Sequence, residues 1–511
     1  MTQPSSPSKR SNAVDEPGSG NCSVLEVSFS ILNCTVGSGI LALPFALKDS
    51  GFGLGLTLSV VVSVLCWFAL YILIVTGQRI GVYKYAALCE ATMGSFGVYL
   101  LSSVLFFQAV GACITYMIVI GDTIPVVLEI VGINATRQWT IFVSSLIFIL
   151  PLLFYRSVGS LAKASIVSVA TLPPILLVVA IRGFHYAPEH KRSYEFVGDN
   201  VFPAIGVMAF AMLSTQTAFL NFTTMKQPTR KAWAHATIIA VFLSWLVSFA
   251  FAIFGFIAFG VDVKANIFNS FPLTDGLINF GRGLLGFSMF LTFPQAFYPA
   301  RTALHSAFGH EDNVKIPTDN QHLYTTIGLF VPILICGVFV KDLGLLYQLI
   351  GGFCSTFLAY IIPALCYFLV FWKKNSALGS SSRLISEDEH GESRYDDEED
   401  SQEDEEERLL KKAAANRKQH HMGHEEEQDV AITGTAVASY GATDSSSSSA
   451  SASSQEDLLA TAAHMRQGYT NNGSEKTDLW LDIGSGVLLV FGVFVMVIST
   501  SLTLKKMLGA V

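Results

Sequence analysis

The sequence predicts an all-α polytopic membrane protein with eleven transmembrane helices. Its 511 residues are 51% hydrophobic and 14% charged, with a mean hydropathy of +0.48, which is too apolar for a soluble enzyme. Eleven apolar runs are long enough to cross a bilayer about 30 Å thick. Runs one and six are interrupted near their centres by small and polar residues, which a purely spanning helix does not need.

The apolar runs follow in chain order from hydropathy and length. They cover 24–47, 52–76, 98–121, 138–155, 158–181, 201–222, 233–260, 277–297, 323–340, 343–372 and 484–504. Between runs two and three, Tyr83–Met93 predicts a short helix at the membrane interface or in a loop. Residues 23–372 therefore form helices one to ten, and residues 484–511 form helix eleven with a short C-terminus.

Two polar segments lie outside this membrane core. Residues 1–22 predict a disordered cytosolic N-terminus, and residues 373–483 predict a disordered acidic cytosolic insert. Such compositions bury too little apolar surface to offset the entropy of ordering. Residues 374–478 hold 23 acidic and 10 basic side chains, so the net charge of −8 comes from the insert alone. No basic stripe predicts nucleic-acid binding.

The sequence predicts no catalytic residue, metal site or prosthetic group. The eight cysteines lie mostly in apolar runs without a C-x-x-C pair, which predicts small buried hydrophobes. Histidines 420, 421 and 424 lie among polar residues of the insert, which favours solvated side chains over a metal cluster. No nucleophile elbow, phosphate-binding glycine loop or H-E-x-x-H motif occurs, so no enzyme is predicted.

Lysine and arginine in the short loops favour a cytosolic N-terminus, by twelve residues to nine. The cluster Lys226, Arg230 and Lys231 carries most of this bias. The sequon Asn134–Thr136 then falls on the outer side, which agrees with the orientation.

Run one contains the segment Asn33–Pro44, which places two glycines, a serine and a proline together. Glycine and proline weaken a helix and free backbone groups, and freed groups cannot face lipid. A spanning helix broken at its centre is typical of the binding site of a secondary transporter. The alternative is close helix packing by the same small residues.

The break in run one predicts a site for a carboxylate. The amide groups and dipole of a half-helix suit an anion, and carbonyls on the other side of the break suit a cation. The residues of run one expected to bind substrate are Thr35, Val36, Gly37, Ser38 and Gly39.

Run six is interrupted at Ala211–Thr217. We expect Ala211, Ser214 and Thr215 to give the substrate backbone and hydroxyl contacts. The alternative is that the hydroxyls bond back to their own helix. If runs one to five and six to ten are inverted repeats, the two broken helices are equivalent. The predicted fold is then a 5+5 inverted-repeat core with broken helices 1 and 6, plus helix 11.

Five segments in the same order resemble the amino acid/auxin permease family, over about 23–372 and 484–504. They are Asn33–Pro44; Gly121–Thr123; Leu161–Ser165; Gly206–Ala211 with Gln227–Thr229; and Phe280–Arg282 through Thr292–Pro294 to Arg301. The chain is most similar to its sodium-coupled neutral and vacuolar amino acid transporters. The resemblance implies eleven helices, five-plus-five inverted repeats and alternating access.

The chain departs from some of these relatives at three places. Run six has Ser214–Thr217 where some of them carry a histidine or asparagine, and the outer loop 182–200 has no cysteine. The acidic insert is unusually long. These departures leave the identity of the substrate open.

Four residues are the candidates for coupling transport to H⁺ or Na⁺. The resemblance places a sodium-coordinating hydroxyl near Ser288 and Thr292, and oxygen ligands suit a hard cation together with Asn33 and first-run carbonyls. Lys163 lies one to two turns into run five, where a lysine with a lowered pKa would replace sodium and make coupling proton-based. The alternatives are an intrahelical hydroxyl and a lysine that snorkels to the interface.

The insert contains an acidic dileucine pattern, formed by Glu405, Leu409 and Leu410. Such patterns are read by sorting adaptor proteins, which favours a vacuolar or lysosomal membrane over the plasma membrane. Short motifs of this kind also arise by chance in acidic tracts.

Together these patterns predict a secondary active transporter of neutral L-amino acids that works by alternating access. The expected partners are a small amino acid substrate, the lipid bilayer and adaptor proteins at the insert. A different hypothesis is an amino-acid sensor with little flux that signals through the insert. Deleting the insert distinguishes them, since a transporter keeps its flux and a sensor loses its partners.

Overall fold

The computed structural model describes most of the membrane core. The described residues are 20–154, 167–168, 170–191, 194–308, 317–371 and 479–509. Lys163, the sorting-signal residues Glu405, Leu409 and Leu410, and nearly all of both predicted polar segments lie outside them.

Helices account for the secondary structure of the described residues, apart from one isolated bridge between Cys22 and Met225. Eight helices are long and apolar enough to cross a membrane, and one bent pair brings the number to nine. The eight are Phe52–Ile80, Ser95–Ile130, Val201–Thr223, Arg230–Asp262, Gly276–His305, Asp319–Phe339, Leu343–Phe371 and Leu479–Met507. The bent pair is Val24–Thr35 with Ser38–Ser50.

Two of the eleven predicted spans fall short of this criterion. Run four corresponds to the shorter apolar helix Arg137–Leu153, formed by α6 (Arg137–Ser144), a π-helical turn and α7 (Leu150–Leu153). Run five is only partly described, as α9 (Leu172–Tyr186). The number eleven therefore remains a prediction, while the all-helical, multi-pass architecture is confirmed.

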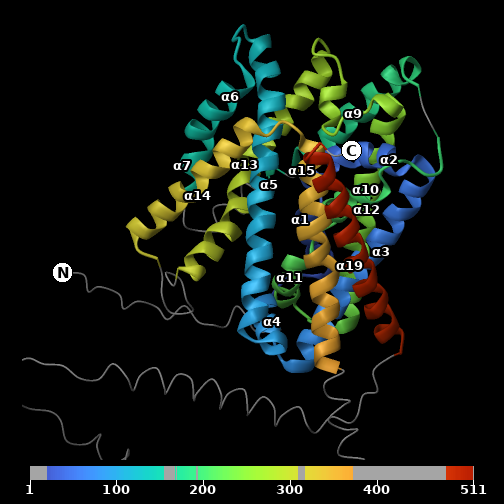
Figure 1. Cartoon of the computed structure of the whole chain (residues 1–511), viewed down its shortest axis with the longest axis vertical. Helices are drawn as coiled ribbons and strands as arrows, with labels where there is room; N and C mark the ends of the chain where they lie inside the picture. Colours follow the sequence, from blue (N-terminus) through green and yellow to red (C-terminus); the bar gives the residue numbers. More distant parts are fainter. Residues whose placement is uncertain are drawn as a thin grey trace, which may run out of the picture. The chain divides into compact units, whose positions relative to one another are not determined.

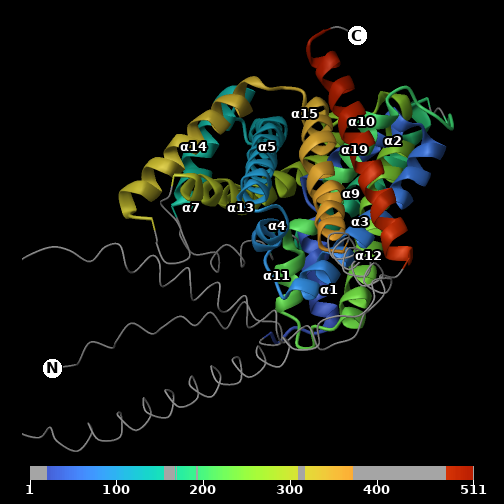
Figure 2. The same ribbon diagram turned by 60° about the horizontal axis from the view of Figure 1, so that its bottom comes forward.

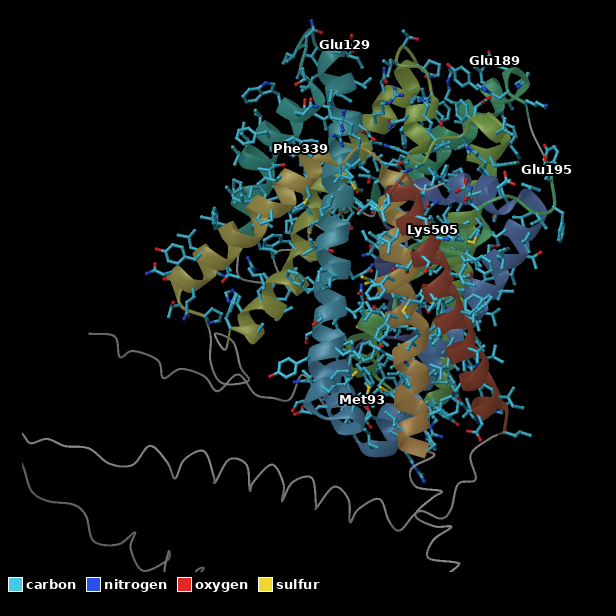
Figure 3. The ribbon with its side chains drawn as sticks, in the orientation of Figure 1. Met93, Glu129, Glu189, Glu195, Phe339 and Lys505 are labelled. Atoms are coloured by element: carbon cyan, nitrogen blue, oxygen red, sulfur yellow. The ribbon has the colours of Figure 1, made fainter. Side chains whose placement is uncertain are left out.

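Figure 1 shows the long α5 (Ser95–Ile130) beside α13 (Gly276–Ala307), and the two helices pack extensively on each other. In the turned view of Figure 2, α14 (Asp319–Phe339) lies next to α7, and α14 also packs on α6. In Figure 3, Glu129, Glu189 and Glu195 lie toward one end of the bundle and Met93 toward the other. The predicted outer loops thus share one end, opposite the predicted interface helix, α4 (Tyr85–Met93).

The first span bends because its sequence stops one helix and starts another. A capping box between Ser23 and Glu26 begins α1 (Val24–Thr35), and Val36 ends it. A short 3₁₀ turn, η2 (Ser38–Ala42), follows, and Pro44 lies in the first turn of α2 (Leu43–Ser50), where its missing N–H costs nothing. The two halves differ in direction by 53°.

Close backbone packing joins α10 (Val201–Ala211) to the π-helical turn η8 (Gly351–Ser355). A Cβ atom on Gly351 would overlap the carbonyl oxygen of Gly206, and one on Gly206 would lie 2.8 Å from the amide nitrogen of Gly352. Only glycine allows this approach. Span ten is therefore held directly against the first half of span six.

Asp275 caps the start of α13 and ties it to α9. Its carboxylate accepts hydrogen bonds from the amides of Leu277 and Ile278, from Arg182 at 2.6 Å and from Tyr186 at 2.9 Å. Burial alone would raise the pKa of Asp275, but the bonds from Ile278 and Arg182 outweigh it and hold that pKa below its usual value. This contribution to stability is present above the unfolded pKa and is lost as pH falls through the lowered folded pKa.

Candidate functional site

The break in the first span leaves three consecutive amide groups without a partner. Within the described part of the chain, the N–H groups of Gly37, Ser38 and Gly39 donate no hydrogen bond. Unpaired backbone donors at buried positions are rare and need a ligand, water or side chain. The Thr35 hydroxyl donates back to the carbonyl of Ile31 at 2.8 Å, so it bonds within its own helix and not toward the break.

The second break lies where α10 ends at Ala211 and the 3₁₀ turn η5 (Thr215–Thr217) begins. The side chains of Ser214 and Thr215 are fully buried. The Thr215 hydroxyl donates to the carbonyl of Leu358 in span ten, at 3.0 Å, rather than to its own helix. The Ser214 hydroxyl lies 3.6 Å from the Cys66 thiol of α3 (Phe52–Ile80). Both hydroxyls therefore join span six to other spans.

The two breaks face each other directly. A Cβ atom on Gly39 would lie 2.9 Å from the Cα of Ala211, so the backbones of spans one and six touch here. The Cys34 thiol of the first span also contacts the Thr217 hydroxyl of the second break. The structure thus brings together the predicted substrate residues of run one and run six.

Two tyrosines that were not predicted from the sequence lie against the first break. Tyr347 of α15 (Leu343–Ile350) donates its hydroxyl to the Ser38 carbonyl at 2.9 Å. Its ring lies 5.0 Å from that of Phe210, one residue before the second break. Tyr116 of α5 lies beside the Ser38 side chain. A tyrosine inside an apolar run indicates only that its hydroxyl has a hydrogen-bond partner. The sequence does not show which residue that partner is.

We expect Tyr347→Phe to weaken substrate binding at the first break. The change leaves the buried Ser38 carbonyl without its donor, which costs about 1–3 kcal/mol. The apparent KM for the transported amino acid should rise, with Vmax changed less, in reconstituted vesicles. Tyr324→Phe on the exposed face of α14 is the matched control. An unchanged KM in Tyr347→Phe would show that this bond does not shape the site.

Two polar anchors hold the 3₁₀ turn η7 (Ile267–Ser270) against η2 of the first break. Asp122 of α5 accepts hydrogen bonds from Asn266 at 3.2 Å and Asn269 at 2.8 Å. The buried guanidinium of Arg282 donates to the carbonyls of Phe268 and Phe271 and to the Asn279 side chain. These anchors stabilise the loop that packs on the break.

The candidate ion-coupling hydroxyls form a cluster between α13 and the chain preceding α9. Ser168 Oγ lies 2.6 Å from Ser288 Oγ and 2.6 Å from Thr292 Oγ1. Thr292 also donates to the Ser288 carbonyl at 2.8 Å, the intrahelical bond that was the alternative. Ser168 was not predicted from the sequence.

The side-chain oxygen of Asn33 on the first span is a candidate cation ligand. Its Oδ1 atom is buried and accepts no hydrogen bond from any described residue. No hydrogen bond between described residues joins Thr292 to first-run carbonyls or to Asn33, so a shared cation site stays a prediction. Lys163, the alternative coupling group, lies outside the described residues.

These features define a helical, multi-pass membrane protein with two broken spans in contact. Residues 20–384 match the family described as transmembrane amino acid transporter protein. The chain therefore belongs to this family, the amino acid/auxin permease family that its motifs resemble. The family consists of transporters and not of enzymes.

Several named relatives agree with this assignment. A Bos taurus protein named "Putative sodium-coupled neutral amino acid transporter 11" is 30% identical over 350 residues, 66% of this chain and 74% of that protein. Vacuolar amino acid transporter 2 of Saccharomyces cerevisiae is 29% identical, over 68% of this chain and 76% of its own length. Sodium-coupled neutral amino acid transporter 7 of Rattus norvegicus is 24% identical, over 69% of this chain and 80% of its own length.

Among solved structures, the chain has a distant likeness to a Na⁺-coupled sialic acid symporter in a substrate-bound outward-open state. The TM-score is 0.42 at 12% identity, covering 69% of this chain and 79% of that one. A likeness at this level supports no conclusion about the site.

Proposed function

We propose that this protein is a secondary active transporter of neutral L-amino acids, coupled to a proton or sodium gradient. The observation that carries the proposal is the run of amide groups at Gly37, Ser38 and Gly39, which have no partner among the described residues and lie in contact with the second break at Ala211. These donors suit the α-carboxylate that amino acids share. Membership of an amino acid transporter family supports the same substrate class.

The two breaks suit an amino acid with a neutral side chain. Neither Asn33–Gly39 nor Ala211–Thr217 contains a charged residue, and the neighbouring side chains Phe210, Tyr116 and Tyr347 are aromatic. The α-carboxylate binds the first-break amides, and the α-amine binds carbonyl oxygens at the breaks. An apolar side chain then packs on the aromatic rings.

We propose alternating access by rocking of one half of a 5+5 inverted-repeat core against the other. The positions of the two breaks, five predicted spans apart, support this repeat. The named vacuolar relative and the acidic dileucine at Glu405, Leu409 and Leu410 favour a vacuolar or lysosomal membrane. The insert then faces the cytosol, where adaptor proteins bind.

Gradient-driven uptake tests the function and separates the two coupling ions. Uptake of a mixed pool of labelled amino acids is measured in proteoliposomes that contain the purified protein, under an imposed proton or sodium gradient. We expect uptake under one gradient. Proton-driven uptake should be abolished by Lys163→Ala, whereas sodium-driven uptake should survive Lys163→Ala and be lost in Thr292→Val, because valine keeps the shape without the ligand oxygen. Binding without uptake under either gradient would contradict transport and favour the sensor.

A further inference from the structure

The outer half of the first span ends in a buried carboxylate that none of the predicted sites uses. Asp49 is the penultimate residue of α2, and only 7% of its surface is exposed. Its backbone carbonyl accepts a hydrogen bond from the amide of Asn200 at 2.9 Å. Ionisable side chains buried in membrane proteins are costly and are usually functional.

The partner of Asp49 is an amide side chain with one bond missing. Gln348 of α15 is 1% exposed and donates its Nε2 to Asp49 Oδ2 at 3.1 Å. The Oε1 atom of the same amide is buried and accepts no hydrogen bond from any described residue. An unsatisfied buried acceptor costs about 1–3 kcal/mol.

A proton on Asp49 would supply the hydrogen-bond donor that Gln348 Oε1 lacks among the described residues. A carboxylate only accepts hydrogen bonds, whereas a protonated carboxyl group also has one O–H donor. A neutral carboxyl and a primary amide can then pair through two hydrogen bonds, with the O–H donating to Oε1 and Nε2 donating to the other oxygen. Protonation also removes a buried charge, which burial disfavours.

Three charged side chains of the described residues act on Asp49. Lys506 of α19 (Leu479–Met507), Lys48 of its own helix and Asp199 of the exposed loop act on it. In Figure 3 the neighbouring Lys505 lies near the end of α19 beside α15, and these two helices are in contact. No ion pair to Asp49 forms among the described residues.

The other helices packed against α2 offer no further partner. α10 has no charged side chain, and η2 has none either. The charged side chains of α3 and α12 (Arg230–Phe259) lie near the helix ends away from Asp49: Arg79, Arg230, Lys231 and His235. On α15 the titratable neighbour is Tyr347, whose hydroxyl is bonded to Ser38.

Adjacent residues of α15 hold both ends of the outer half of span one. Gln348 bonds Asp49 at its outer end, and Tyr347 bonds the Ser38 carbonyl at the substrate break. A second bond between Asp49 and Gln348 therefore fixes α15 against η2 and α2, and with it the break. This is a direct physical route from the outer carboxylate to the substrate site.

We propose that Asp49 and Gln348 form a proton-binding site that links the outer pH to amino acid binding at the first break. The proton comes from water on the outer side and binds a carboxylate oxygen of Asp49. No other covalent bond forms or breaks. The inference rests on the proposed transport function and adds a site for the proton. Lower outer pH strengthens substrate binding from that side.

Asp49→Asn tests this site, because asparagine presents an N–H donor and a carbonyl oxygen permanently and cannot titrate. Uptake by wild type should increase as the outer pH falls from about 8 to about 5. Uptake by Asp49→Asn should be flat across this range and within about threefold of the wild-type acidic plateau, since one hydrogen bond replaces another. Glu195→Gln, which removes an exposed carboxylate of the same loop that is not among the charges acting on Asp49, should keep the wild-type profile.

A series of thermal-unfolding measurements over the same pH range tests the proton site independently of transport activity. Asp49→Asn should unfold at a higher temperature than wild type at high pH, and the two should converge as pH falls and Asp49 becomes neutral. Gln348→Met should also flatten the uptake profile, since it removes the amide. Identical pH profiles in wild type and Asp49→Asn, in uptake or in unfolding, would overturn the site. If wild type takes up no amino acid but the unfolding difference persists, the transport function fails and the proton site stands.

Discussion

Replacing Gly39 with alanine is expected to abolish most amino acid uptake while leaving the protein folded. The added methyl would lie 2.9 Å from the Cα of Ala211 and 3.0 Å from the Phe210 ring, and the first of these is backbone that cannot rotate away. The two broken spans must separate to accept it. Overpacking of this kind costs about 1–3 kcal/mol, which corresponds to about a 5- to 150-fold fall in uptake.

The control for Gly39→Ala is the same substitution at Gly328 on the exposed face of α14. A Cβ atom on Gly328 meets nothing within 4 Å, so uptake should stay at the wild-type level. Both variants are compared by initial rate of uptake and by elution as a single peak in size-exclusion chromatography. Wild-type rates in Gly39→Ala would show that contact between the two breaks is not needed for transport.

The second large effect is expected on stability, from Arg282→Met. The guanidinium is fully buried and donates to the carbonyls of Phe268, Phe271 and Pro272. Methionine fills a similar volume and donates no hydrogen bond, so these buried acceptors lose their partner at about 1–3 kcal/mol each. We expect a loss of roughly 3 kcal/mol or more in the free energy of unfolding.

Thermal unfolding in detergent measures this loss, with Lys341→Met as the control. Lys341 is an exposed residue between α14 and α15, so its removal changes the net charge equally without breaking buried bonds. Arg282→Met should unfold at a clearly lower temperature than Lys341→Met. Equal unfolding temperatures would show that the η7 turn does not depend on Arg282.

The sequence identified both breaks, because glycine, serine and proline at Asn33–Pro44 and polar residues at Ala211–Thr217 cannot belong to an ordinary spanning helix. It also predicted a short helix at Tyr83–Met93, seen as α4. It placed Thr35 and Thr215 among the substrate-binding residues, whereas the Thr35 hydroxyl bonds within its own helix and the Thr215 hydroxyl bonds span ten. Which way a hydroxyl turns depends on neighbours that local sequence does not contain.

The residues that were missed are those defined by distant partners. Tyr347 and Ser38 are 309 residues apart, and Ser168 and Ser288 are 120 apart. Asp49 lies two residues beyond the first predicted apolar run, and only its packing against Gln348, 299 residues away, shows that it is buried and bonded. Pairings at this separation follow from tertiary packing and not from periodicity, so a single sequence gives no signal for them.

Counterflow tests most directly whether the two touching breaks form an alternating-access amino acid site. Proteoliposomes loaded with unlabelled neutral amino acid, with equal ion concentrations and pH on both sides, are diluted into a trace of the labelled compound. Wild type should accumulate the label transiently above its outer concentration, because unlabelled amino acid leaving through the site is exchanged for labelled amino acid entering. Gly39→Ala should accumulate no label. Absence of accumulation in wild type that still binds the labelled amino acid would contradict transport through this site.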